Sequence, residues 1–251
     1  GVAAGELVAK ADPDGHTLLL ISNGTAVSAG LFKSLPFDTQ RDFAPISMLA
    51  TFDIAVITQA DSKFKSLGDL VAFAKANPGK LNLGTINIGS TQNLTGELFK
   101  SAAGIDVQIV PFNGTPAVIT ALRGNQIDAA VEILGPVMPH IGSKAVRALA
   151  VTGSKRSAVL PDVPTAVESG VPGLVASSWN GLAAPAKTPA AVIARLNKDI
   201  KAAVEAPDVK SKLRALNMEA QASSPEQTAE LLASETRRWG DVIVRAKIPT
   251  Q

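Results

Sequence analysis

The sequence predicts an α/β fold, in which strands and helices alternate along the chain. Short runs rich in Val, Ile and Leu alternate with amphipathic helical stretches from end to end. Several of these runs lack apolar–polar alternation, which is typical of strands buried on both faces. The 251 residues are 46% hydrophobic but only 4% aromatic, which suits layered packing of small apolar side chains. This length allows one large domain or two modest ones.

The expected strands are short and lie in the first two thirds of the chain. They are the runs 17–22, 54–58, 81–86, 107–111, 128–133 and 146–152. Segment 5–11 is expected to form a helix ahead of the first strand, with a turn at Asp12-Pro13-Asp14-Gly15 between them. An α/β domain rarely begins with a helix, so this order indicates a unit whose first strand is missing.

Later helices have readable starting signals. A capping box at Ser66 and Asp69 precedes a stretch with apolar residues spaced i, i+3, i+4 and i+7. Thr188-Pro189 and Ser224-Pro225 open two further amphipathic helices near the C-terminus. The sequence contains no repeat and no Gly/Ser linker, so two domains would be joined by crossing strands rather than by a tether.

Composition and motifs exclude several classes of protein. Lys and Arg number 24 against 22 Asp and Glu, and they form no basic stripe, so nucleic-acid binding is not expected. No apolar run approaches the roughly 18 residues that span a membrane. Cysteine is absent, and His16 and His140 lack the spacing of a metal site, so neither a metal nor a cofactor is expected. Nucleotide-binding and hydrolase motifs are missing as well, and no catalytic residue is predicted.

Polar turns that follow expected strands form the candidate binding site. Their residues offer hydroxyl, amide or free backbone groups: Ser22, Asn23, Gly24 and Thr25; Asn87, Ile88, Gly89, Ser90 and Thr91; and Asn113, Gly114 and Thr115. In open α/β sheets ligands bind at the carboxyl ends of strands, where helix N-termini attract anions. Such turns could bind a carboxylate without an Arg clamp. The same residues are also what turns and N-caps require, so both interpretations stay open.

Glu132 and Trp179 are further candidates for the site. Glu132 lies in an apolar run, where a carboxylate is costly unless it has a partner, so it could accept a hydrogen bond from a ligand hydroxyl or ammonium. A structural hydrogen bond or a solvent-exposed strand end explains it equally well. Trp179 and Asn180 precede an Ala- and Pro-rich extended segment, where the tryptophan could wall a cleft or pack in the core.

Several segments along the chain together resemble one protein family. They are GELVAKA at 5–11, PDGHTLL at 13–19, LPFD at 35–38, DFAP at 42–45, PGKLN at 78–82, GELFK at 96–100, RALAVT at 147–152, LPDVPT at 160–165 and a tryptophan segment at 178–185. Each is weak alone. Their order and spacing resemble the substrate-binding proteins of tripartite tricarboxylate transporters, the TctC-like or Bug receptor family, over essentially the whole chain.

That resemblance implies a type II periplasmic binding-protein fold, with two α/β lobes, crossing strands and a ligand cleft between the lobes. The first lobe would comprise 1–53 and 180–251, and the second 54–179. The resemblance also implies a periplasmic receptor, not an enzyme, that captures a small organic carboxylate and delivers it to a membrane permease. The few cations in the candidate turns favour a mono- or dicarboxylate over a tricarboxylate.

The resemblance also implies a position for each candidate residue. Residues 22–25 would belong to the first lobe, and 87–91 with 113–115 to the second. Glu132 would occupy an acidic pocket position at which the family more often has Asp, and Trp179-Asn180 would lie at the crossover. Family members open with a strand, a carboxylate-clasping loop and a second strand that this sequence lacks. The first lobe is therefore expected to be N-terminally incomplete, with truncation favoured over natural loss.

Two other classes of protein stay open as alternatives. An effector-sensing domain of a transcription regulator can have a similar fold, but it would need a basic helix-turn-helix, and none is visible. A small-molecule enzyme could use Glu132 as a general base. That role lacks a second titratable partner at a readable spacing, because both histidines lie elsewhere in the sequence.

Overall fold

The computed structural model describes residues 2–250, and the chain divides into two compact units. Unit 1 comprises Gly1–Thr51 and Ser178–Gln251, and unit 2 comprises Phe52–Ser177. These divisions follow residues 51 and 177, whereas the sequence analysis places them after 53 and 179. Each unit contains both strands and helices, which confirms the expected α/β class.

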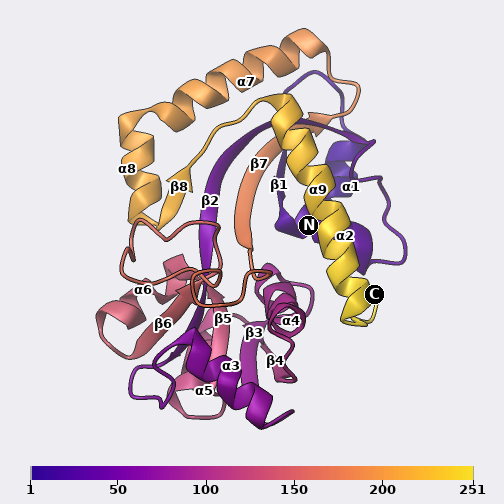
Figure 1. Ribbon diagram of the computed structural model, residues 1–251. Helices are drawn as coiled ribbons and strands as arrows, with labels where there is room; N and C mark the ends of the chain where they lie inside the picture. The colour runs from indigo at the N-terminus through magenta and orange to yellow at the C-terminus, as the bar shows by residue number, and fades with distance from the viewer. Residues whose placement is uncertain (1, 251) are drawn as a thin grey trace. The chain divides into compact units, whose positions relative to one another are not determined.

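Unit 2 is a mixed sheet with helices on both faces (Figure 1). Its strands are the end of β2 (Phe43–Gln59), β3 (Asn82–Ile86), β4 (Gln108–Phe112), β5 (Ala129–Ile133) and β6 (Val146–Val151). Its helices are α3 (Leu67–Ala76), α4 (Thr91–Ala103), α5 (Thr115–Arg123) and α6 (Leu134–Gly142). Strand β3 is parallel to both β4 and β5, so these three strands end at the same edge of the sheet. Strand β2 runs antiparallel to β5 and to β6.

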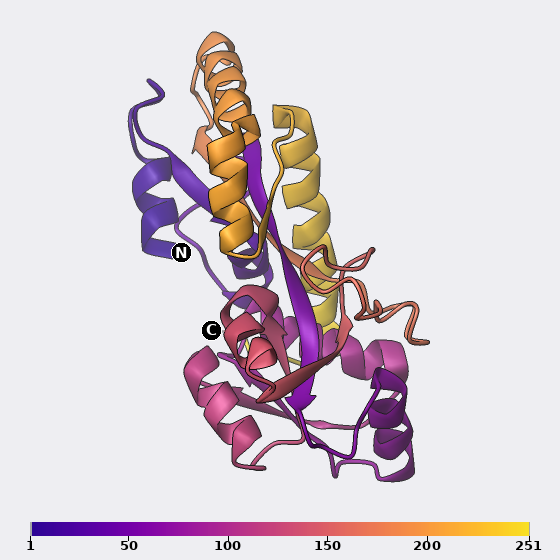
Figure 2. The same cartoon turned by 90° about the vertical axis from the view of Figure 1, so that its left-hand side faces the viewer.

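Side chains from both faces of this sheet are buried in separate apolar clusters. Ile54 and Val56 pack with apolar residues of α3 and α4. Ala55 and Ile57, which point to the other face, pack with residues of α5 and α6. Figure 2 shows α3 and α4 on one side of the sheet and α5 on the other. The absence of apolar–polar alternation in the sequence follows from this burial on both faces, as predicted.

Unit 1 surrounds the first half of β2. Its helices and strands are α1 (Val2–Ala9), β1 (Leu19–Ser22), α2 (Asn23–Leu31), β7 (Ser177–Pro185), α7 (Ala190–Glu205), α8 (Pro207–Ala215), β8 (Met218–Ala220) and α9 (Pro225–Arg245). Strand β7 lies between β1 and β2, and β8 also pairs with β2. Helices α2 and α9 pack closely, because a side chain on Gly30 would come within 3.3 Å of the Gly240 backbone.

The structure extends two expectations and corrects a third. Strand β2 covers 17 residues, whereas the sequence predicts a strand only over 54–58. Strand β7 begins at Ser177, so it includes Trp179 as well as the expected extended segment after it. The expected turn at 22–25 is instead a helix start, because Ser22 caps α2 and residues 23–25 form its first turn. Among the helices of residues 2–250, none combines the length and the hydrophobicity of a membrane span.

Candidate functional site

The carboxyl edge of the unit 2 sheet brings three groups of predicted site residues together. Ile86 and Phe112 are paired at the ends of β3 and β4, and the polar segments 87–91 and 113–115 follow directly. Glu132 is the penultimate residue of β5, the other neighbour of β3. The hydroxyl of Thr115 donates to Glu132 Oε2 at 3.0 Å. Of the three polar turns expected at sheet edges, 87–91 and 113–115 lie together here, whereas 22–25 belongs to unit 1.

Both polar segments of unit 2 lead into helix N-termini. Ser90 is the N-cap of α4, and its hydroxyl accepts a hydrogen bond from the Asn93 backbone N–H at 3.1 Å. Gly114 is the N-cap of α5 and has no side chain to cap the helix. Its φ of 90° and ψ of 162° lie in a region that is essentially restricted to glycine. The positive ends of the α4 and α5 dipoles therefore lie at this edge of the sheet.

Gln92 and Asn93 also take part in the site, although the sequence does not single them out. Both are 4% exposed in the first turn of α4. Gln92 Nε2 donates to Glu132 Oε2 at 3.4 Å. Asn93 accepts from the Gly89 N–H at 3.1 Å and donates to the Thr85 hydroxyl at 3.2 Å, which fixes the loop against β3. The clue in the sequence is a pair of amides at a helix start.

Glu132 is fully buried, and its two carboxyl oxygens have different surroundings. Oε2 accepts both hydrogen bonds described above, whereas Oε1 has no hydrogen-bond partner among the residues described. Burial raises the pKa of Glu132, and the hydroxyl of Thr115, the amide of Gln92 and the Ile133 backbone oppose that rise, in decreasing order. Glu132 is therefore neither a solvent-exposed strand end nor fully satisfied by structural hydrogen bonds.

The candidate residues of unit 1 also lie close together. Ser22 of β1 and Asn180 of β7 are direct partners across an antiparallel pair. The Ser22 hydroxyl accepts from the Gly24 N–H, and the Ser22 N–H donates to the Thr25 hydroxyl, which completes a capping box. Trp179, next to Asn180, is 2% exposed, and its Nε1 has no hydrogen-bond partner in the described part of the chain. In unit 1, the segment 22–25 therefore lies next to Trp179 and Asn180.

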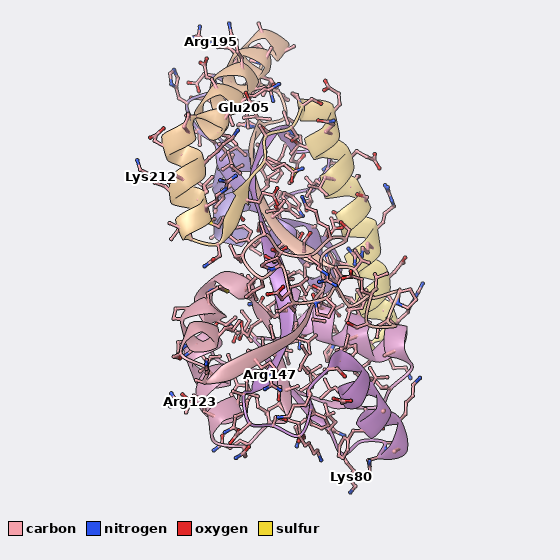
Figure 3. The ribbon with its side chains drawn as sticks, turned by 60° about the vertical axis from the view of Figure 1, so that its left-hand side comes forward. Lys80, Arg123, Arg147, Arg195, Glu205 and Lys212 are labelled. Carbon is pink, nitrogen blue, oxygen red and sulfur yellow. The ribbon has the colours of Figure 1, made fainter. Side chains whose placement is uncertain are left out.

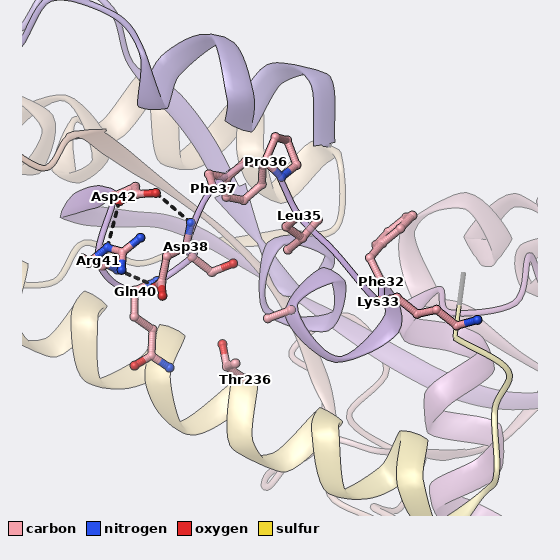
Figure 4. Close-up of a pocket in the computed structure, with 12 residues that line it drawn as sticks. Phe32, Lys33, Leu35, Pro36, Phe37, Asp38, Gln40, Arg41, Asp42 and Thr236 are labelled. Atoms are coloured by element: carbon pink, nitrogen blue, oxygen red, sulfur yellow. Dashed lines mark hydrogen bonds and ion pairs between the residues drawn. The ribbon is translucent and has the colours of Figure 1, made fainter.

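A pocket in unit 1 contains none of the predicted site residues (Figure 4). It has a volume of about 640 Å³ between segment 32–42, Ala29 of α2 and Thr236 of α9. Asp38 accepts from the backbone of Gln40 and Arg41, and Asp42 accepts from the Asp38 N–H. These carboxylates hold their own loop in shape. The hydroxyl of Thr39, another lining residue, has no hydrogen-bond partner among the described residues.

Among the residues that the structure describes, the candidate site contains no basic side chain. In unit 2, Lys80 precedes β3, Arg123 is in the last turn of α5, and Arg147 is in the first half of β6. These positions are at the end of the sheet opposite its carboxyl edge, and Figure 3 labels the three residues in unit 2. Within residues 2–250, no group of three or more His, Asp or Glu could hold a metal. The site offers neutral donors, helix N-termini and one buried carboxyl group.

Fold and site together define a two-unit α/β binding protein of the periplasmic type. Residues 1–248 match the tripartite tricarboxylate transporter family receptor, TctC, and the chain belongs to this family. Its members are substrate-binding receptors rather than enzymes, and they are periplasmic binding proteins. The resemblance identified in the sequence is therefore confirmed.

Known relatives cover nearly the whole chain. Protein BugT of Bordetella pertussis is 34% identical over 245 residues, which are 97% of this chain and 75% of BugT. The structure of R. palustris Rpa4515 with adipate has a TM-score of 0.85 at 29% identity, over 99% of this chain and 84% of that one. MatC (Rpa3494) from Rhodopseudomonas palustris with bound malate has a TM-score of 0.78 at 31% identity, over 96% and 84%.

Proposed function

We propose that this chain is the solute-binding receptor of a tripartite tricarboxylate-type transport system. In this proposal it captures a mono- or dicarboxylate between its two units in the periplasm and delivers the acid to a membrane permease. Unit 1 would act as the first lobe and unit 2 as the second. A ligand that contacts both lobes favours their closed arrangement, which the permease would recognise.

The observation that carries this proposal is the set of neutral donors around one buried carboxyl group in unit 2. Asn87 and Asn113 are exposed at the sheet edge, and the N-termini of α4 and α5 lie beside them. Backbone N–H groups at a helix N-terminus bind carboxylates well, because they are aligned with the helix dipole. This arrangement suits one or two carboxylates, whereas three negative charges would need cationic partners that the site lacks.

Unit 1 would supply the second set of ligand contacts. The helix start at 22–25 offers further N–H groups, and the Ser22–Asn180 pair places an amide beside it. Trp179 would add an apolar wall with one unused N–H donor. The similar structures with adipate and with bound malate support the same ligand class, since both of these ligands are dicarboxylic acids.

The test is a thermal-shift screen of mono-, di- and tricarboxylates together with amino acids. A ligand that binds only the native state raises the unfolding midpoint, and the rise grows with its concentration. We expect a rise with at least one mono- or dicarboxylate and no turnover of that acid. A folded protein that responds to no acid, or to tricarboxylates alone, would contradict the proposal.

Two asparagines of unit 1 provide a matched pair of variants for this screen. N180A removes an amide at the proposed site and is expected to abolish the shift. N197A removes an amide that donates to the carbonyl groups of Ile46 and Ser223, so it has a structural role. N197A should lower the starting midpoint and keep the ligand-induced shift. Loss of the shift in both variants would point to a general loss of folding.

A further inference from the structure

Glu132 poses a chemical problem for a receptor that binds anions. The side chain is completely buried at the edge where the ligand carboxylate would lie, and no Lys or Arg is among its hydrogen-bond partners. Two ionised carboxylates in one such site repel each other, and water cannot screen them well. Where two carboxyl groups share a site, one of them usually keeps a proton at pH values at which it would otherwise lose it.

The hydrogen bonds around Glu132 indicate where that proton would reside. Thr115 and Gln92 both donate to Oε2, so this oxygen acts as an acceptor, like the carbonyl oxygen of a carboxylic acid. Oε1 is buried and has no partner among the described residues. An O–H group at Oε1 would be a donor, which is what a ligand carboxylate needs.

We propose that Glu132 binds the ligand as a neutral carboxylic acid, with Oε1 donating its proton to a carboxylate oxygen of the bound acid. This inference rests on the proposed function, because it requires a carboxylate at the site. If Glu132 is ionised in the ligand-free protein, it takes a proton from solvent when the ligand binds. That proton stays on Oε1, and no covalent bond to the ligand forms. Binding at such a pH then takes up one proton for each ligand.

The charged groups on elements near Glu132 do not account for the shift in its pKa. Helix α4 carries Glu97 and Lys100, which pair with each other at 3.8 Å. Arg123 and His140 lie in the last turns of α5 and α6, at the ends of these helices away from Glu132. The unit 2 part of β2 contributes Asp53, and β3 has no charged residue. None of these groups is among the causes that shift the pKa of Glu132, which burial dominates.

The first test is calorimetric titration of the intact chain with adipate and with malate between pH 6.5 and 8.5. Free carboxylic acids with ordinary pKa values near 4 are ionised throughout this range. Repeating each titration in two buffers with different ionisation enthalpies counts the protons taken up. We expect uptake that approaches one proton per ligand, with affinity falling by up to tenfold per pH unit above the pKa of free Glu132.

The variant E132Q separates a neutral donor from an ionised acceptor. Its amide can keep an acceptor towards Thr115 and present N–H to the ligand, so binding should persist and lose its dependence on pH. If Oε1 instead accepts from a ligand hydroxyl or ammonium, E132Q presents a donor to a donor and binding falls. E97Q is the matched control, because Glu97 is also partly buried with a raised pKa. It should leave the proton count unchanged.

Infrared difference spectroscopy gives a readout that does not depend on the pKa of the free protein. The complex should show the carbonyl band of a protonated carboxyl group, and this band should disappear in E132Q and remain in E97Q. A complex without that band, or loss of binding in E132Q with its fold intact, overturns the inference while the receptor function stands. If no acid binds the wild-type chain at any pH, the proposed function itself fails.

Discussion

Thr115 and Glu132 are joined by a 3.0 Å hydrogen bond that connects the first residue of α5 to the end of β5. The bond links a helix N-terminus to a fully buried carboxyl group, so it orients both. It is also the strongest influence that opposes the rise in the pKa of Glu132 caused by burial. Changes at either residue should therefore alter stability and titration together.

T115V removes this hydroxyl donor while keeping the size and branching of the side chain. We expect a loss of about 1–2 kcal/mol in the free energy of unfolding at pH 7, because a buried acceptor loses a partner. The pKa of Glu132 should rise further. Urea denaturation measures the first effect and pH titration the second. T115S should restore both, whereas T120V should change neither, since the Thr120 hydroxyl only donates to Pro116 within α5.

Stability should depend on pH through Glu132. Its pKa in the folded state is raised above 4.5, so the folded protein holds the proton more tightly than the unfolded chain does. This contribution is fully present below about pH 4.5 and is lost as pH rises through the folded-state pKa, by about 1.4 kcal/mol per pH unit between the two values.

E132Q isolates that contribution, because glutamine does not titrate. The stability of the variant relative to wild type should increase as pH rises from 4.5 through the pKa of Glu132 in the folded protein. Denaturation midpoints at a series of pH values provide the measurement. The pH dependence of E97Q stability is measured in parallel, because burial also raises the pKa of Glu97. It shows how much of the wild-type pH dependence comes from that second carboxyl group. A constant difference between E132Q and wild type across this range would contradict the assignment.

Sequence patterns are sufficient to predict the strands of unit 2, because both faces of the sheet are buried. Ile54 to Ile57 are all fully buried, so they form an uninterrupted apolar run that is easy to recognise. The first half of β2 is not predicted from the sequence, because half-buried positions interrupt its apolar run and Pro45 is typical of a strand break. A strand that continues through two units also lacks the turn residues that normally mark where a strand begins.

The sequence predicts most residues of the candidate site but not the contacts between them. The polar segments after β3 and β4 follow from the rule that ligands bind at the carboxyl edge of a sheet. The contact of Gln92 with Glu132 depends on which face of α4 is buried, and polar residues give no such signal. The pairing of Ser22 with Asn180 depends on the register of segments far apart in the sequence. Gly24 suggested a turn where Ser22 in fact caps a helix.

The two tryptophans are expected to respond differently to replacement by phenylalanine. Nε1 of Trp179 has no partner among the described residues, so W179F loses only packing, which we expect to cost about 1 kcal/mol. Trp239 Nε1 donates to Glu235 at 2.7 Å, so W239F should cost about 2–3 kcal/mol. Calorimetric titration should show weaker acid binding, by about tenfold, in W179F alone. Equal affinities in the two variants would mean that Trp179 only packs in the core.

Gly114 should tolerate substitution less well than a glycine that has left-handed helical φ and ψ angles and open space around its Cα. G114A forces a side chain into a conformation with φ of 90° and ψ of 162°, which should cost about 1–3 kcal/mol of unfolding free energy. Relief of that strain would move Thr115 away from Glu132, so acid affinity should also fall.

Gly104 is the control, since it ends α4 at φ 60° with no atom within 4 Å of an added Cβ. G104N should cost less than about 1 kcal/mol and leave affinity unchanged, because Asn accepts this geometry. Urea denaturation and calorimetric titration of both variants test this difference, and a G114A protein as stable as G104N would contradict it.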